Sequence, residues 1–373
     1  MNGADTRPHR PRRHWNRVVP AVPFRTSAGA RMSNDPTRPP TRRDAMRGLG
    51  AGLATAPLVL AATAGNAQAP SPQASGPARR EGLRDPRNSY PKPPFAAQQQ
   101  PWPGLAKNMN PRPDHGETSY VGSGRLAKRK ALITGGDSGM GRAAAIAYAR
   151  EGADVAINYL PAEEPDAREV VELIRQAGRK AVAIPGDLRD EAFCRRLVEE
   201  AVRELGGLDI VVCNAGRQQA RGSILDISTE DFDATMKTNI YAPFWIIKAA
   251  LPHLQPGSAI IGTTSEQAYD PSPDLYDYAQ TKAATMNYVK SLAKQLGPKG
   301  IRVNGVAPGP VWTPLQISGG ATEGKVVTFG ATAPLGRPGQ PAELAGIYVR
   351  LAEDDGSYTT GNIYGAAGGQ GNP

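Results

Sequence analysis

Apolar positions divide the chain near residue 126. From Leu126 onward, short apolar runs alternate with segments in which apolar residues recur every three or four positions. The runs are typical of buried strands, and the spaced segments are typical of helices with one buried face. The expected strands are Ala131–Thr134, Asp154–Tyr159, Ala181–Ile184, Ile210–Cys213, Ala259–Gly262, Arg302–Val306 and Gly361–Gly365. The expected helices are Gly141–Glu151, Ala167–Ala177, Glu191–Leu205, Glu230–Leu254, Asp277–Leu296 and Pro341–Leu351.

This alternation predicts an α/β protein. Strand–helix repetition over residues 126–373 indicates one parallel sheet of the Rossmann type, doubly wound, with helices on both faces. In such sheets ligands bind outside the carboxyl ends of the strands, near the point where the strand order reverses. Residues that follow the strands are therefore the candidates for chemistry.

The first 125 residues lack such periodicity and divide into three parts. Residues 1–69 form a basic leader, 70–100 a flexible tether and 101–125 an extended, proline-rich arm. Within the leader, Arg42-Arg43 precedes a weakly apolar run and the small-residue site Ala67–Ala69, which is typical of a twin-arginine export signal. Met32 is an alternative start. This pattern favours export to the periplasm; the alternatives are a disordered basic tail and a cytoplasmic protein.

Charge and cysteine content narrow the choice of partners. The formal net charge is +9, but residues 1–90 contain 15 Arg, no Lys and 5 acidic residues, so the rest of the chain is nearly neutral. A neutral body disfavours nucleic-acid binding, which needs basic residues on the folded domain. The apolar run of the leader is too short for a stable membrane span. Two cysteines and four scattered histidines predict neither a disulfide framework nor a metal site.

A glycine-rich loop follows the first expected strand. Residues 134–142 read TGGDSGMGR and lead directly into a helix. Glycines permit a sharp turn and close approach of a pyrophosphate, which the free N–H groups at the helix N-terminus can bind. Asp187 follows the third strand, where its carboxylate would accept a hydrogen bond from an adenine amino group, and Asn214-Ala215-Gly216 follows the fourth.

The end of the second strand bears on the type of dinucleotide. Asn158 and Tyr159 stand there, where a site dedicated to NAD has an acidic residue that binds the ribose 2′-hydroxyl. The missing acid removes repulsion against a 2′-phosphate, so NADP(H) is favoured, with NAD(H) as the alternative. Arg142 is the nearest basic residue and the candidate for attracting that phosphate.

Three further residues follow the fifth strand. Tyr278 and Lys282 are four positions apart and share one helix face. A tyrosine that exchanges a proton near neutral pH needs a lowered pKa, which the ammonium of Lys282 is expected to supply against the opposing effect of burial. Ser265, 13 residues before Tyr278, can hydrogen-bond a substrate carbonyl oxygen. The Tyr–Lys pair alone is weak evidence; its place at the same sheet edge as the glycine loop gives it weight.

Together these motifs resemble the classical short-chain dehydrogenases/reductases. The resemblance covers residues 125–369 and includes TGGDSGMG, CNAG with Cys213 in place of the usual Asn, YAQTK, and Pro308-Gly309. It implies that Asn239 completes a catalytic tetrad by holding a proton-relay water near Lys282, and that Lys282 also binds the nicotinamide ribose. The dinucleotide contacts implied are Gly135, Asp137, Ser138, Gly139, Met140, Gly141, Asn158, Tyr159, Asp187, Leu188, Asn214, Ala215, Gly216, Tyr278, Lys282, Pro308, Gly309, Val311 and Thr313.

The resemblance is greater to the branch of glucose/ribitol dehydrogenases and NADP-dependent aldehyde reductases. It implies hydride transfer between nicotinamide and a small carbonyl or alcohol substrate, and a homotetramer. Residues 312–338, rich in Gly and Thr, are expected to form a mobile lid over the substrate. The alternative is a sensor or scaffold that binds the cofactor without turnover.

Overall fold

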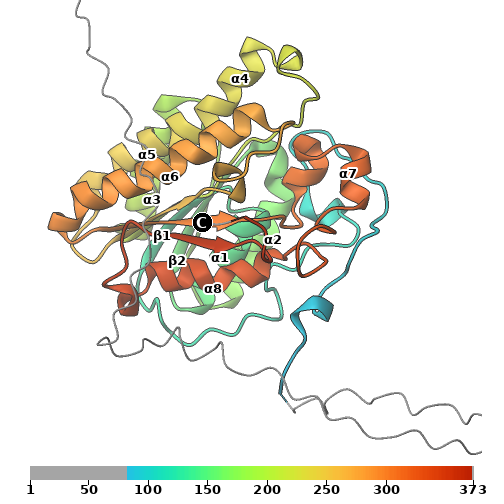
Figure 1. Cartoon of the computed structure of the whole chain (residues 1–373). Helices are drawn as coiled ribbons and strands as arrows, with labels where there is room; N and C mark the ends of the chain where they lie inside the picture. The colour runs from blue at the N-terminus through green and yellow to red at the C-terminus, as the bar shows by residue number, and fades with distance from the viewer. Residues whose placement is uncertain (1–81, 372–373) are drawn as a thin grey trace, which may run out of the picture. The chain divides into compact units, whose positions relative to one another are not determined.

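The expected doubly wound α/β fold is confirmed. The computed structural model describes residues 82–371, so the expected leader lies outside the described part. Seven parallel strands form one sheet in the order β3-β2-β1-β4-β5-β6-β7, so the order reverses between β1 and β4. Figure 1 shows this sheet with β1 and β2 labelled. The strands are β1 Lys130–Thr134, β2 Asp154–Tyr159, β3 Ala181–Pro185, β4 Ile210–Cys213, β5 Ala259–Thr263, β6 Arg302–Pro308 and β7 Ile363–Ala366.

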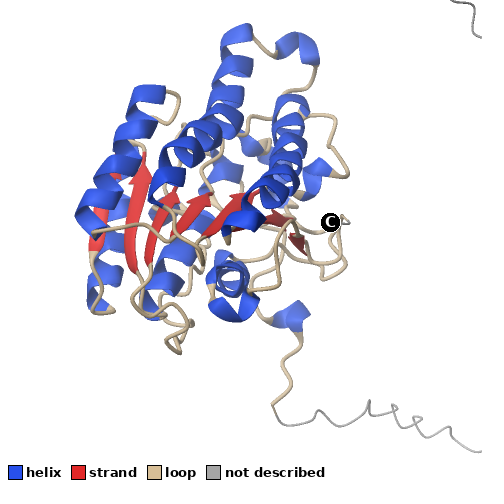
Figure 2. Ribbon diagram, turned by 90° about the vertical axis from the view of Figure 1, so that its left-hand side faces the viewer, coloured by secondary structure: helices blue, strands red, loops and turns tan. Residues whose placement is uncertain are grey.

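Helices cover both faces of this sheet (Figure 2). The α-helices are α1 Gly139–Arg150, α2 Glu164–Gln176, α3 Glu191–Leu205, α4 Thr229–Met236, α5 Ala242–Ala250, α6 Tyr276–Leu296, α7 Glu323–Val327 and α8 Pro341–Ala352. Side chains alternate across β1, so that Ala131 and Ile133 enter the core shared with α1, α2 and α8. Leu132 enters the opposite core, shared with α3, α5 and α6.

The long helix expected over Glu230–Leu254 is interrupted. The α4 helix passes into a π-helical turn, Lys237–Tyr241, before α5 begins. Pro243 lies in the first turn of α5 and has no N–H to donate to the carbonyl of Asn239, four residues earlier. The proline explains the break, and it removes the ordinary helical donor of the Asn239 carbonyl.

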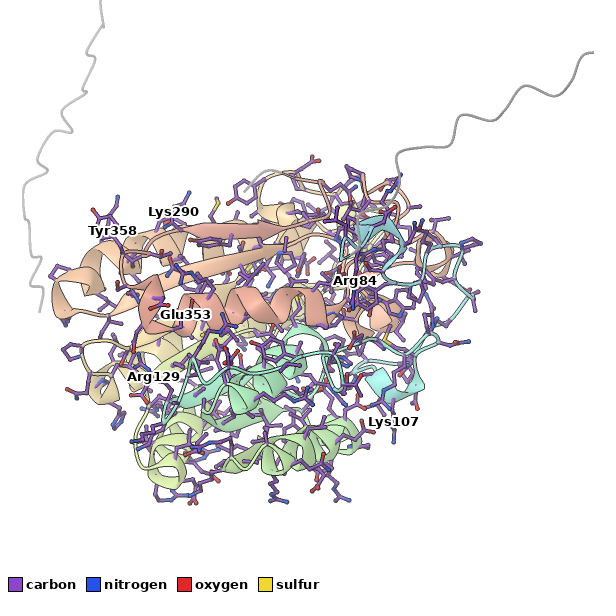
Figure 3. The ribbon with its side chains drawn as sticks, turned by 90° about the horizontal axis from the view of Figure 1, so that it is seen from below. Arg84, Lys107, Arg129, Lys290, Glu353 and Tyr358 are labelled. Carbon is purple, nitrogen blue, oxygen red and sulfur yellow. The ribbon has the colours of Figure 1, made fainter. Side chains whose placement is uncertain are left out.

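Residues before β1 pack on the domain. The stretch expected to be a flexible tether, residues 70–100, is described from residue 82, and contrary to that expectation its later part is held in place. The Phe95 N–H donates to Val327 O at 2.9 Å, and the Phe95 ring stacks on Trp312 with the ring centroids 4.3 Å apart. Apolar burial of Phe95 against Trp312 favours this docking. Lys107 also lies on this arm (Figure 3), next to buried Ala106.

No helix within residues 82–371 is long and apolar enough to cross a membrane.

Candidate active site

A cavity of about 320 Å³ opens at the carboxyl ends of β1, β4 and β5. This is the edge at which doubly wound sheets bind ligands. All the predicted site residues line it except Gly141 and Asn239. Those that line it are Gly135, Asp137, Ser138, Gly139, Met140, Asn158, Tyr159, Asp187, Leu188, Asn214, Ala215, Gly216, Ser265, Tyr278, Lys282, Pro308, Gly309, Val311 and Thr313.

The glycine loop leaves the start of α1 open to this cavity. Gly135 and Gly139 have φ angles of +60° and +52°, a backbone region that other residues rarely adopt. A Cβ atom on Gly141 would come within 2.0 Å of the Gly135 carbonyl oxygen, so Gly141 lets the helix pack onto the loop. Ser138, the residue before the helix, makes no side-chain capping bond. The first N–H groups of α1 therefore remain available to an anion.

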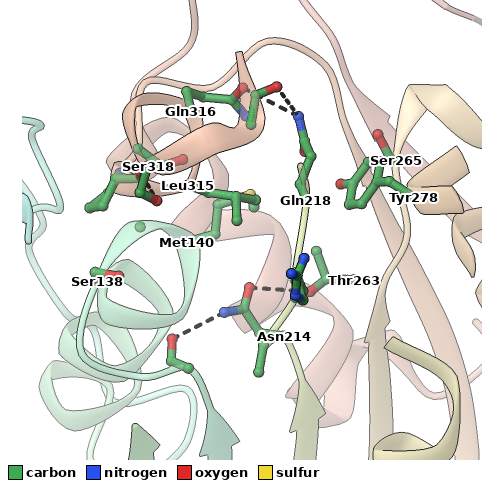
Figure 4. A pocket seen from close by; sticks show the side chains of 18 of the residues that line it. Ser138, Met140, Asn214, Gln218, Thr263, Ser265, Tyr278, Leu315, Gln316 and Ser318 are labelled. Atoms are coloured by element: carbon green, nitrogen blue, oxygen red, sulfur yellow. Dashed lines mark hydrogen bonds between the residues drawn. The ribbon is translucent and has the colours of Figure 1, made fainter. Parts of the chain in front are cut away.

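Asn214 fastens the glycine loop to the neighbouring strands. Its Nδ2 donates to the carbonyl oxygens of Thr134 at 3.3 Å and Gly135 at 3.1 Å. Its Oδ1 accepts a hydrogen bond from Thr263 Oγ1 at 3.4 Å (Figure 4). One side chain thus holds the ends of β1, β4 and β5 together around the cavity.

Ser265 and Tyr278 lie next to each other across the cavity from Ser138 and Met140 (Figure 4). Ser265 follows β5, and Tyr278 lies in the first turn of α6. One turn later, the Nζ atom of Lys282 lies 5.3 Å from the centroid of the Tyr278 ring and donates to Thr263 O at 2.8 Å. All three side chains are buried. The expected serine, tyrosine and lysine are therefore assembled at one wall.

The expected lowering of the Tyr278 pKa is not found in this site. Burial raises the pKa of Tyr278 above its ordinary value, while a hydrogen bond with Ser265 acts in the opposite direction. Burial also lowers the pKa of Lys282 to about 8. The ammonium shares the buried environment of the phenol and donates to Thr263 O, so removal from water outweighs its effect on the tyrosine.

Asn239 lies behind the cavity wall. Its Nδ2 donates to Arg217 O and to Thr281 Oγ1, each at 2.9 Å, and its Oδ1 accepts from Arg217 N at 2.8 Å. The Asn239 side chain thus links the segment after β4 to α6. Pro243 cannot act as the ordinary helical donor to the main-chain carbonyl of Asn239.

Arg142 was expected to attract a 2′-phosphate of the dinucleotide, and this expectation is wrong. This side chain is 1% exposed and does not line the cavity. Its guanidinium forms ion pairs with Glu117 at 3.0 Å and Glu169 at 2.9 Å. Glu117 belongs to the arm before β1, and this long-range partner cannot be identified from the local sequence.

Two expected cofactor contacts also have protein partners. Asp187, expected to meet an adenine, pairs with Arg189. Asn158 Nδ2 donates to the carbonyl oxygens of Ile184 and Gly186, each at 3.2 Å. Asn158 therefore joins β2 to β3 beneath the cavity and presents no charge to it.

Some cavity residues have no signal in the sequence. Trp102 and Gly104 reach the cavity from the arm, which has no periodic pattern. Glu266 also lines it; burial raises the Glu266 pKa to about 7, and its Oε2 has no hydrogen-bond partner among the described residues. Its position directly after Ser265 was the available clue.

Of the segment 312–338, expected to form a lid, residues between Thr313 and Phe329 line the cavity. Trp312 is fully buried in a cluster with Phe95, Met109 and Val326. Above the cavity, Gln218 Nε2 donates to Gly320 O at 2.8 Å and approaches Gln316 Oε1 (Figure 4). Residues 312–338 therefore contact both the arm before β1 and the segment after β4.

Comparison with known proteins extends this description. A family model described as enoyl-(acyl carrier protein) reductase matches residues 135–370. The chain is 57% identical over 288 residues to the uncharacterized oxidoreductase YghA of Escherichia coli, a match that spans 77% of this chain and 98% of that protein. It is 41% identical over 276 residues to a glucose and ribitol dehydrogenase of Daucus carota, spanning 73% and 94% of the two chains.

Solved structures with a similar fold also include short-chain dehydrogenases. A short-chain dehydrogenase from Burkholderia cenocepacia in complex with NADP is 35% identical, with a TM-score of 0.62, over 66% of this chain and 98% of that one. A metagenomic blue fluorescent protein in complex with NADPH is 34% identical, with a TM-score of 0.61 and the same coverage. With its parallel seven-stranded sheet, its glycine loop and these relatives, the chain belongs to the short-chain dehydrogenase/reductase family of oxidoreductases.

Proposed function

We propose that this protein is an NAD(P)-dependent dehydrogenase/reductase that interconverts a carbonyl compound and an alcohol. The observation that supports this most strongly is that Ser265, Tyr278 and Lys282 share one cavity with the open N-terminus of α1. The dinucleotide, when bound, supplies or accepts a hydride. The protein then has to bind the cofactor, polarise the carbonyl and move one proton.

Each residue has a role in this proposal. The N–H groups at the start of α1 bind the pyrophosphate, and Gly135 and Gly139 allow its close approach. Ser265 Oγ donates a hydrogen bond to the substrate oxygen. The Tyr278 hydroxyl gives its proton to that oxygen in reduction and takes it back in oxidation. Lys282 binds the nicotinamide ribose and supports the phenolate, and Pro308, Gly309, Val311 and Thr313 form the wall beside the nicotinamide.

In this proposal a water molecule bound to the main-chain carbonyl of Asn239 relays protons to the site. The Asn239 side chain is committed to Arg217 and Thr281. Its main-chain carbonyl, to which Pro243 cannot donate, would accept a hydrogen bond from a relay water near Lys282. Asn239 thereby acts as a positioning residue.

NADP(H) is the favoured cofactor in this proposal, because the two structural relatives above contain NADP and NADPH. NAD(H) is the alternative. The carrot relative, a glucose and ribitol dehydrogenase, favours sugars and polyols as substrates, and the family resemblance adds aldehydes. Glu266 Oε2, which has no hydrogen-bond partner among the described residues and lies beside Ser265, suits a substrate with a second hydroxyl group. The resemblance further favours a homotetramer. Export by the leader stays a prediction, since residues 1–69 lie outside the described part.

Steady-state assays with NADPH and NADP⁺ test the proposal. A panel of aldehydes, sugars, polyols and an enoyl thioester should yield turnover with at least one carbonyl–alcohol pair. Dinucleotide binding without turnover of any member would favour the sensor or scaffold. Turnover of the enoyl thioester alone would instead assign the reduction of a carbon–carbon double bond.

A further inference from the structure

Residues 100–105 of the arm before β1 form a closed loop, here called the arm loop. The Leu105 N–H donates to Gln100 Oε1 at 2.8 Å, and Gln100 Nε2 donates to Leu105 O at 3.1 Å. These two bonds join the first and last residues of the loop. The family match begins at residue 135, so it gives the arm loop no role.

One side of the arm loop packs on the segment that follows β6. Gln100 N donates to Ile317 O at 2.8 Å. Gly104 is buried, and a Cβ atom there would lie 3.0 Å from Ser318 Cβ and 3.2 Å from Pro314 O. The main chain of the arm loop is thus in direct contact with residues that line the cavity.

The other side of the arm loop is bound to α2. Directly after the loop, Ala106 N donates to Asp166 Oδ2 at 2.5 Å, and Lys107 N donates to Asp166 Oδ1 at 3.3 Å. Asp166 is fully buried in the first turn of α2. The strands that precede these two anchors, β6 and β2, lie on opposite sides of β1. The arm loop therefore crosses the cavity at the end of β1, where the glycine loop begins.

A contact of the glycine loop confirms the place of this crossing. A Cβ atom on Gly139, the first residue of α1, would lie 3.2 Å from Thr313 Cγ2. Thr313 immediately precedes Pro314, on which Gly104 packs. The open N–H groups of α1 and the arm loop thus contact neighbouring residues of the same segment, so a pyrophosphate bound to α1 would lie beside the loop.

The arm loop also presents an uncovered tryptophan to the cavity. Trp102 lines the cavity, yet it is 39% exposed, and its indole N–H makes no hydrogen bond within residues 82–371. A large aromatic side chain left uncovered beside a cavity is typical of a ligand contact.

We propose that the arm loop is a strap over the bound dinucleotide, and that the Trp102 indole covers the cofactor where it passes the start of α1. The indole N–H can donate to a phosphate oxygen, and the ring offers apolar contact to the adjoining ribose. Because both sides of the loop are anchored, the strap acts mainly by slowing release of the dinucleotide. This inference rests on the cofactor part of the proposed function.

Stopped-flow displacement measures this effect without turnover. Protein saturated with NADPH is mixed with excess NADP⁺, and the change in NADPH fluorescence gives the release rate. W102A should release NADPH ~10-fold faster than the wild type, with a similar rise in the dissociation constant, and W102F, which keeps a ring, should lie between the two. V121A is the matched control, because Val121 is exposed on the same arm and does not line the cavity; its release rate should stay that of the wild type.

A variant outside the cavity tests the closure of the loop. Gln100 does not line the cavity, so Q100M removes both bonds to Leu105 without removing a cofactor contact. It should speed NADPH release by ~5-fold, the effect of losing one hydrogen bond of ordinary strength. A wild-type release rate in Q100M would contradict the strap.

Acrylamide quenching of tryptophan fluorescence reports directly on the indole. NADP⁺ should reduce this quenching in the wild type, since it covers the exposed ring of Trp102, whereas Trp312 is fully buried already. W102F should lose most of the protection.

Three results would overturn the inference while leaving the enzyme proposal intact. The first is a release rate of W102A within about twofold of the wild type. The second is quenching that NADP⁺ does not change. The third is a raised KM for the carbonyl substrate with unchanged NADPH release, which would place the indole over the substrate instead. If the wild type binds neither dinucleotide, the inference and the proposed function fail together.

Discussion

Lys282 Nζ lies 5.3 Å from the centroid of the Tyr278 ring and donates its hydrogen bond to Thr263 O. Both groups are buried, and burial lowers the pKa of Lys282 to about 8. The site therefore holds an ammonium in surroundings that disfavour its charge. A ligand that brings hydrogen-bond acceptors to this ammonium would offset that cost.

Lys282→Met should make the ligand-free protein more stable at pH 7 while abolishing turnover. An unfolded lysine keeps its proton to about pH 10.4, so between pH 8 and that value the unfolded state binds more protons and stability rises with pH. The full penalty is present below pH 8. Removing this penalty, after subtraction of the lost hydrogen bond to Thr263, should raise the free energy of unfolding of Lys282→Met by ~2 kcal/mol. This corresponds to a Tm increase of about 5 °C.

Thermal melts at pH 7 and pH 10 check this prediction. The difference between variant and wild type should shrink at the higher pH. Lys290→Met, at an exposed position of the same helix (Figure 3), should leave the melting temperature almost unchanged. A lower melting temperature for Lys282→Met at pH 7 would show that the buried ammonium is net stabilising.

Gly141→Ala should damage the cofactor loop. The added Cβ would lie 2.0 Å from Gly135 O and 2.6 Å from Asn214 Nδ2, so α1 must move away from the loop. We expect a loss of about 1–3 kcal/mol in unfolding free energy and weaker dinucleotide binding, measured by denaturant titration and calorimetry. Gly346→Ala in α8, where a Cβ meets nothing within 4 Å, should instead be neutral or slightly stabilising. Equal effects of the two substitutions would argue against the packing role of Gly141.

Phe95→Ala should weaken the packing of the arm before β1 on residues 312–338, which line the cavity in part. Phe95 is buried against Trp312 and Val326, and truncating a buried phenylalanine costs about 3–5 kcal/mol. Limited proteolysis should cut the variant before β1 faster than the wild type, and the KM for substrate should rise because Trp102 of the arm lines the cavity. Leu83→Ala, at an exposed position, is the control. Unchanged cleavage and KM would mean that the arm is held by other contacts.

The sequence was most informative where a local pattern determines structure. The apolar runs predicted all seven strands to within two residues at each end, and residues that follow those strands line the cavity. The sequence could not predict contacts between residues that are far apart along the chain. Arg142 pairs with Glu117 of the arm, and Trp102 reaches the cavity from a stretch without periodicity. The pKa of Tyr278 was misjudged because burial, which follows from packing, outweighs the charge spacing along the helix.

The most direct test of the central claim is the turnover of Tyr278→Phe. Loss of the hydroxyl should lower kcat at least ~100-fold, while the dissociation constant for NADP⁺ stays close to that of the wild type. Tyr288→Phe is the matched control, since this tyrosine is on the same helix and its hydroxyl has no partner among the described residues; its kcat should be unchanged. Wild-type turnover in Tyr278→Phe would contradict the assignment of that hydroxyl as the proton donor and acceptor.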